Sequence, residues 1–162
     1  MKAFITGALL GATLAVPAAA QSGDVAAGES EFRKCRACHM IQDADGTDIV
    51  RGGATGPNLW NIMGAPIAHE EGFRYGEGLL AAREANPDFT WTEEEMVAYV
   101  TDPTAWVREK SGDASARSKM TFKLNRGQED VAAYLASVSP DYTPGGAAEA
   151  GEAAEGEAAP AQ

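Results

Sequence analysis

The stretch Cys35-Arg36-Ala37-Cys38-His39 has the pattern Cys-x-x-Cys-His, in which two thiols are separated by two residues and followed directly by a histidine. This pattern is the attachment signature of a c-type haem. On a helical turn each thiol can form a thioether with one haem vinyl group, and the histidine then faces the iron. The stretch therefore predicts that Cys35 and Cys38 hold one haem and that His39 is its proximal ligand.

Other uses of a Cys-x-x-Cys pair fit the chain poorly. A structural zinc site needs about four Cys, His or carboxylate ligands, whereas the chain has two cysteines and two histidines, the second being His69. A thioredoxin-like pair is expected beside a βαβ pattern, and the sequence around this one is typical of helices. We expect His69 to be an ordinary solvent-facing residue.

The N-terminal residues have the pattern of an export signal. A positive start at Met1-Lys2 precedes an apolar run from Phe4 to Val16, and Ala18-Ala19-Ala20 then forms a small-residue cleavage site. The alternative is an uncleaved membrane anchor, but the run is shorter than the ~20 apolar residues that span a bilayer. We interpret residues 1–20 as a cleaved signal peptide and expect the mature protein in the periplasm.

The C-terminal residues 141–162 consist mostly of Ala, Gly, Glu and Pro, with Tyr142 as the only large apolar residue. Such a composition cannot bury a core, so we expect a disordered acidic tail. Residues 21–140 remain as one small monohaem domain. The net charge of −11 argues against nucleic acid as a partner.

The two ends of this domain are predicted to be helices that pack against each other. Asp24 is a potential N-cap for a first helix reaching Cys38, and the small Gly28 would let a second helix approach closely. Asn125 and Gln128 have the form of a capping box for the last helix. The expected buried faces are Val25, Gly28 and Phe32 in the first helix, and Val131, Tyr134, Leu135 and Val138 in the last.

Three shorter helices are predicted between them. One covers Leu79–Glu84, and a second follows a capping box formed by Thr92 and Glu95. A third begins at Pro103, is capped by Asp102 and carries Trp106. Residues 41–56 have no clear period and read as a loop. No alternating run requires a strand, so the fold class is all-α.

The second axial ligand of the iron separates electron carriers from haem enzymes, and methionine paired with histidine is the pattern of carriers. Met1 would leave with the signal, and Met40 adjoins the proximal histidine. Met63 and Met96 lie in apolar segments where packing in the core explains them. Met120 lies in a loop before the last helix. The spacing alone leaves open whether Met120 binds iron or packs in the core.

The chain resembles a class I cytochrome c of the bacterial cytochrome c₂ type, in particular its soluble cytochrome c₅₅₀ members, from about residue 23 to residue 140. The resemblance implies a class I cytochrome c fold with one covalently attached haem c. The residues that carry it are Gly28, Phe32, Cys35, Cys38, His39, Thr55-Gly56-Pro57-Asn58-Leu59, Trp91, Tyr99 and Lys119-Met120-Thr121-Phe122-Lys123-Leu124.

The resemblance also implies roles for individual residues. Met120 would be the distal iron ligand. The carbonyl group of Pro57 would accept the proton on the far ring nitrogen of His39, which orients the imidazole and raises its basicity. Tyr75 and Trp91 match positions that bond the haem propionates, and Tyr99 matches one beside the methionine sulfur.

A protein of this kind carries single electrons and is not an enzyme. The resemblance implies a bc₁ complex as donor, and a terminal oxidase, a photosynthetic reaction centre or a periplasmic reductase as acceptor, each met by transient docking of a monomer. Two alternatives remain open on the residues alone. One is a dedicated haem subunit of a periplasmic oxidoreductase, and the other is a haem enzyme or gas sensor with an open iron position.

Basic residues concentrate near the two expected ligand segments. We expect them to form a positive ring around the exposed haem edge of an otherwise acidic protein, which would steer that edge toward acidic docking sites. A mixed, solvated surface is the alternative. The residues of this basic ring are Arg33, Lys34, Arg36, Arg51, Arg117, Lys119, Lys123 and Arg126.

One departure from the family generates a prediction. Relatives usually have Gly-Arg after the Pro-Asn-Leu segment, with the arginine near a propionate, but this chain has Gly64-Ala65-Pro66. A missing cation near the haem favours ferric iron. The midpoint potential should therefore be lower than in a close relative with the arginine, and Ala65→Arg should raise it in a spectroelectrochemical titration. An unchanged or lowered potential would contradict this prediction.

Overall fold

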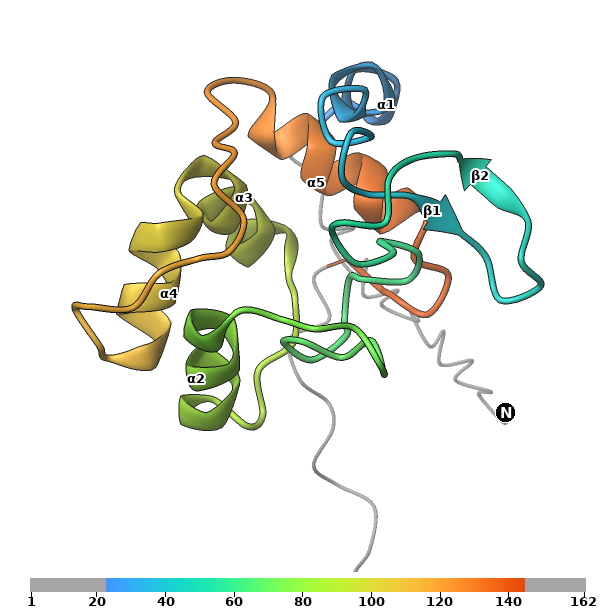
Figure 1. The fold of residues 1–162 in the computed structure, drawn as a ribbon. Coiled ribbons are helices and arrows are strands. Elements are labelled where there is room, and N and C mark those ends of the chain that lie inside the picture. Colours follow the sequence, from blue (N-terminus) through green and yellow to red (C-terminus); the bar gives the residue numbers. More distant parts are fainter. Residues whose placement is uncertain (1–22, 145–162) are drawn as a thin grey trace, which may run out of the picture.

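The computed structural model describes residues 23–144, which form five helices and one small β-hairpin (Figure 1). The predicted signal peptide and residues 145–162 of the predicted tail lie outside the described residues. The expected helical architecture is confirmed, with the small hairpin as its only sheet within the described residues. The elements are α1 (Val25–Phe32), β1 (Ile41–Gln42), β2 (Asp48–Val50), α2 (Glu77–Ala85), α3 (Glu93–Thr101), α4 (Pro103–Ser111) and α5 (Gln128–Ser137).

Helices α1 and α5 pack against each other, as predicted, because a glycine removes the side chain at their contact (Figure 1). A Cβ atom on Gly28 would lie 1.9 Å from the carbonyl oxygen of Asp130 and 2.8 Å from Cβ of Tyr134. Phe32 packs on the Tyr134 ring, with the ring centroids 5.5 Å apart. The first and last segments of the described chain are thereby joined around one buried contact.

The ends of these two helices differ in part from the prediction. Asp24 caps α1 by accepting a hydrogen bond from the backbone of Ala27, as expected. However, α1 ends at Phe32, and the expected core residue Val25 is 36% exposed. The prediction of a capping box for α5 was wrong. The N-cap is Gly127 at φ 74°, and the Gln128 side chain donates to a backbone carbonyl in the preceding segment.

The starts of α3 and α4 follow the predicted capping chemistry. The Thr92 hydroxyl accepts the Glu95 backbone N–H at 3.2 Å, and the Asp102 carboxylate accepts the Ala105 N–H at 3.0 Å. Pro103 occupies the first turn of α4, where a missing N–H costs nothing. These local signals are strong because each satisfies an otherwise unpaired donor at a helix start.

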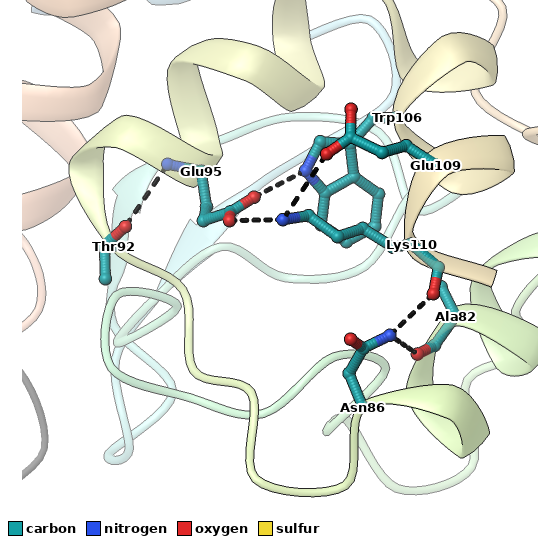
Figure 2. Close-up of polar contacts among 7 residues, drawn as sticks. All are labelled: Ala82, Asn86, Thr92, Glu95, Trp106, Glu109 and Lys110. Atoms are coloured by element: carbon teal, nitrogen blue, oxygen red, sulfur yellow. Dashed lines mark hydrogen bonds and ion pairs between the residues drawn. The ribbon is translucent and has the colours of Figure 1, made fainter. Parts of the chain in front are cut away.

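A polar cluster joins α3 to α4 and α4 to the end of α2 (Figure 2). The Glu95 carboxylate accepts the indole N–H of Trp106 at 2.8 Å and pairs with Lys110 at 2.5 Å. The Asn86 side chain donates to the carbonyls of Ala82 and Lys110 at 2.8 and 2.7 Å. Helix α4 is therefore tied to both α2 and α3 by side chains as well as by packing.

The segment between Ile41 and Gly56, predicted to be a loop, contains the antiparallel pair β1 and β2. Only Ile41 and Val50 within the pair turn toward the core, and Ile49 is 44% exposed. With so few residues, the pair shows no alternation in sequence. Within residues 23–144, no helix is long and apolar enough to cross a membrane.

The first residues of the expected tail pack on the domain. The Asn61 amide donates to the Asp141 carboxylate at 2.6 Å, and its oxygen accepts the Asp141 N–H at 3.3 Å. Tyr142 is half-buried against the core. The packed region therefore continues past the boundary placed after Pro140.

The contact at Gly28 predicts a specific loss of stability. In Gly28→Ala the added methyl group meets backbone atoms of α5, which cannot rotate away, so the helices must separate. We expect a loss of about 3 kcal/mol of unfolding free energy. Gly46→Ala is the matched control, because a Cβ there has no neighbour within 4 Å and only its φ of 83° opposes the change, at about 1 kcal/mol. Equal losses in denaturant titrations of the haem-loaded proteins would contradict the role of Gly28.

Candidate haem site

The motif Cys35-x-x-Cys38-His39 forms a continuous turn directly after α1. The backbone N–H groups of Cys38 and His39 both donate to the carbonyl of Cys35, at 3.1 and 2.9 Å. Both cysteines are free thiols, with Cys35 half-buried and Cys38 exposed. One compact turn thus presents two thiols and an imidazole, as the spacing predicts.

Burial raises the pKa of the Cys35 thiol to about 11. A thiol of this kind carries little thiolate at neutral pH, unlike the activated thiols of redox-active Cys-x-x-Cys pairs. No group of three or more Cys, His, Asp or Glu side chains within residues 23–144 is placed to hold a metal ion. Within the described residues the turn therefore has no further ligands for a zinc ion, and burial works against a thiolate at Cys35.

A glycine-rich segment packs directly on this turn. The N–H groups of Gly53 and Gly56 donate to the carbonyls of Arg36 and Cys38 at 2.9 and 2.8 Å. A Cβ on Gly56 would lie 2.3 Å from Cε1 of His39. In the sequence, the glycines of this segment other than Gly56 indicate only a loop, because a glycine required by close approach gives the same signal as one required by a turn.

His39 is oriented from behind by the same segment. Its Nδ1 lies 2.9 Å from the carbonyl oxygen of Pro57. Because a carbonyl can only accept, Nδ1 carries the proton and Nε2 keeps its lone pair for a metal. Burial lowers the pKa of His39, partly offset by the Pro57 carbonyl and the Glu70 charge, which favours the neutral, metal-binding imidazole.

The loop that carries Met120 is fixed by Ser118, a residue for which the sequence alone indicates no role. The Ser118 hydroxyl accepts the Met120 backbone N–H at 3.2 Å and lies 3.5 Å from the Tyr99 hydroxyl. The Leu124 N–H donates to the Val100 carbonyl of α3 at 2.8 Å. Figure 1 shows this segment, in orange, running from α4 past α3 to α5. Met120 and Tyr99 are thereby brought together, and both are half-buried.

The same loop crosses the start of α2 at close range. A Cβ on Gly76 would lie 2.8 Å from Cβ of Lys119, and one on Gly78 would lie 2.4 Å from the carbonyl oxygen of Arg117. The Lys119 ammonium group also donates to the carbonyl of Arg74 at 2.9 Å. Two glycines, the N-cap Gly76 and Gly78 in the first turn of α2, therefore set how close the Met120 loop comes, and no sequence period indicates them.

Trp91 and Tyr99 lie in one aromatic cluster with Trp106 and Phe89. The Trp91 and Trp106 rings stack with centroids 5.0 Å apart and planes 20° apart, and Tyr99 meets Trp91 edge-on at 5.2 Å. The Trp91 backbone N–H donates to the carbonyl of Ala65 at 2.9 Å. Position 65, where the resemblance implies an arginine, is therefore next to a predicted propionate partner.

Tyr75 comes from the loop before α2. Its hydroxyl accepts the Glu70 N–H at 3.2 Å and keeps its own proton for another acceptor. His69, beside Glu70, was wrongly expected to face solvent. It is half-buried, and within the described residues its Nδ1 is buried without a hydrogen-bond partner. Burial lowers the pKa of His69.

The residues fit a covalently held haem. Two free thiols share a turn with a histidine whose Nδ1 is bonded from behind, and a separate loop presents a half-buried thioether at Met120. Histidine nitrogen and thioether sulfur form the donor set of c-type haem iron. Comparison with known proteins points the same way.

The chain is 57% identical over 157 residues to cytochrome c-550 of Paracoccus denitrificans, covering 97% of this chain and 99% of that protein. The chain belongs to the class I c-type cytochromes of the cytochrome c₂ type. It is also 46% identical to cytochrome c2 of Rhodobacter capsulatus over 138 residues, which are 85% of this chain and 98% of that protein. No protein-family model matches the chain.

The X-ray structure of cytochrome c2 from Paracoccus denitrificans matches with a TM-score of 0.74 at 57% identity, covering 75% of this chain and all of that chain. As a member of this family, the protein has one covalently bound haem c with its iron. Its general role is that of an electron carrier. The predicted family, fold and cofactor are confirmed.

The contact between Gly56 and His39 predicts that this cytochrome tolerates no side chain at position 56. In Gly56→Ala the methyl group would displace the imidazole from the Pro57 carbonyl. We expect a loss of about 2 kcal/mol of unfolding free energy and a lower yield of protein with attached haem. The neighbouring exposed variant Ala54→Ser is the control. Wild-type behaviour of Gly56→Ala in denaturation and haem absorbance would exclude a steric role for this glycine.

Proposed function

We propose that this cytochrome is a periplasmic single-electron carrier. It takes electrons from a bc₁-type complex and delivers them to a terminal oxidase, a photosynthetic reaction centre or a periplasmic reductase. The bound haem supplies the chemistry, a reversible change between ferrous and ferric iron. Cys35 and Cys38 hold it through thioethers, and His39 and Met120 are the axial ligands. The main support is the hydrogen bond from His39 Nδ1 to the Pro57 carbonyl, which leaves the lone pair of Nε2 for a metal.

Rapid electron transfer needs a site that changes little when its charge changes, because every rearrangement adds to the barrier. On the proximal side, the Pro57 carbonyl fixes one ring nitrogen of His39, and Gly56 lies against the ring. The imidazole can neither rotate nor exchange its tautomer while these contacts hold. We infer that the proximal ligand keeps one geometry in both oxidation states.

On the distal side, Ser118 holds the Met120 backbone, and Lys119 is bonded to the carbonyl of Arg74. A thioether at the sixth position keeps other ligands from the iron and favours the ferrous state over the ferric state. This closure separates a carrier from a haem enzyme or a gas sensor. The hydroxyl of Tyr99 lies 3.5 Å from the hydroxyl of Ser118 and would extend this hydrogen-bond network to the Met120 sulfur.

Two further residues are proposed to contact the propionates. Tyr75 keeps a hydroxyl proton to donate, because its oxygen already accepts the Glu70 N–H. Trp91 is buried against both Trp106 and Tyr99, so its indole has a fixed direction. Fixed donors stabilise buried negative charge without reorganisation. We assign both side chains to holding the haem rather than to catalysis.

The basic ring is proposed as the docking face. All eight of its residues are exposed. Lys34, Arg51 and Lys123 pair with nearby carboxylates, but exposed pairs are weak and open readily to a partner. A ring of this kind raises the rate of encounter with acidic surfaces more than it raises affinity. Brief, small contacts are what a carrier that must leave again requires.

The proposal predicts that the purified protein passes electrons to acceptor membranes at a rate that falls as ionic strength rises.

It also predicts that Met120→Ala removes the weak far-red sulfur-to-iron band of the oxidised form and lets carbon monoxide bind the reduced form rapidly. The potential should fall as well, because ferrous iron loses its thioether. Absorbance spectra, potentiometry and stopped-flow reduction measure these effects.

Met63→Leu is the matched control, because Met63 is a buried methionine at 2% exposure and the change conserves volume. It should keep the far-red band and exclude carbon monoxide. If Met120→Ala kept the band, Met120 would not be the ligand. A wild-type protein that binds carbon monoxide readily would instead point to an open iron. Elution with a catalytic chain, rather than as a monomer, would support a dedicated subunit.

A further inference from the structure

One peptide group connects His39 to a carboxylate. The carbonyl oxygen of Pro57 accepts from His39 Nδ1 at 2.9 Å. The N–H of Asn58, which belongs to the same planar peptide unit, donates to Oε2 of Glu70 at 2.9 Å. Imidazole, peptide and carboxylate therefore form one continuous line of two hydrogen bonds.

The two bonds strengthen each other for a chemical reason. The peptide C–N bond has partial double-bond character, so electron density given up at nitrogen appears at the carbonyl oxygen. A carboxylate that accepts the N–H makes that oxygen a better acceptor, because consecutive hydrogen bonds polarise one another. A better acceptor draws the Nδ1 proton and increases electron density at Nε2. Carboxylates bonded directly to a metal-binding histidine act in the same direction.

We propose that Glu70 is a positioning residue that acts on His39 through the Pro57–Asn58 peptide group, making the imidazole a stronger donor to the haem iron. A stronger donor stabilises ferric over ferrous iron, so Glu70 lowers the midpoint potential. The inference rests on the proposed role of His39 as proximal ligand. The Glu70 charge also acts on the His39 ring through space, and the test must separate that effect from the path through the peptide.

Both ends of this line are held in place. The Asn58 side chain makes two hydrogen bonds with the backbone of Gln42, accepting its N–H at 3.0 Å and donating to its carbonyl at 2.7 Å. The following residue, Leu59, donates its N–H to the Met40 carbonyl at 3.0 Å. At the other end, the Glu70 N–H is bonded to the Tyr75 hydroxyl.

Three variants of the haem-loaded protein test the proposal. Glu70→Gln removes the charge but keeps an acceptor oxygen. Glu70→Asp keeps the charge but is one methylene too short to reach the Asn58 N–H. Glu71→Gln removes the charge of the adjacent, exposed residue and is the control for through-space effects. Spectroelectrochemistry gives the potential, and proton NMR of the ferrous form reports the Asn58 amide and the His39 Nδ1–H.

We expect Glu70→Gln and Glu70→Asp to raise the ferrous-to-ferric ratio about threefold at a fixed applied potential, equivalent to about 28 mV at 59 mV per tenfold. The Asn58 amide and His39 Nδ1 protons should both shift upfield, while Glu71→Gln leaves potential and shifts near wild type. A wild-type potential in Glu70→Asp, with its Asn58 amide shifted, would overturn the proposal. So would an equal effect of Glu71→Gln, which would reduce Glu70 to a distant charge.

The far-red band distinguishes this failure from failure of the proposed function. If all three variants keep the band and the ring-current-shifted His39 signals, the axial ligands are intact and only the role of Glu70 is in question. If wild-type protein lacks His39 signals typical of a ligated ring, the proximal assignment itself is wrong. A merely structural role for Glu70 would lower the unfolding free energy without moving the potential of the folded form.

Discussion

The structure depends on the fit between the Cys-x-x-Cys-His turn and the segment from Gly52 to Pro57. The turn exposes its own carbonyls because it is too short to pair them internally, and the glycine N–H groups supply the missing donors. The same approach brings the Pro57 carbonyl to His39. The packing of this one segment on the turn therefore orients His39 and completes the backbone hydrogen bonds of the residues that attach the haem. The close approach to the turn explains why this segment, which lies in no helix or strand, is rich in glycine.

The distal side is built on a different principle. The Met120 loop is held by a few separate bonds, from Ser118, Lys119 and Leu124, rather than by continuous backbone packing. Its closeness to α2 depends on Gly76 and Gly78. Loops held in this way open at lower free energy than packed turns. We infer that the Met120 loop opens more readily than the turn that carries His39.

The sequence carried the parts of this design that are local. Capping at Asp24, Thr92 and Asp102 could be predicted because each cap satisfies donors within three residues of itself. The cap of α5 could not, since Gly127 acts through its left-handed backbone conformation and presents no side-chain pattern. The family resemblance supplied Pro57 and Met120, whose partners lie far along the chain. Ser118 and Glu70 had no signal, because their roles exist only once separate loops meet.

Contacts between separate loops also give single residues more than one partner. Glu70 illustrates this, since its carboxylate reaches Asn58 while its backbone reaches Tyr75, so one residue links the proximal ligand's peptide to a proposed propionate donor. Removing the carboxylate leaves the backbone bond intact, which separates its electrostatic contribution from its structural one. Under this proposal, substitutions at Glu70 change the midpoint potential of the iron through the Pro57–Asn58 peptide group, while the iron ligands stay the same. Evolution of potential within such a fold need not touch Cys35, Cys38, His39 or Met120.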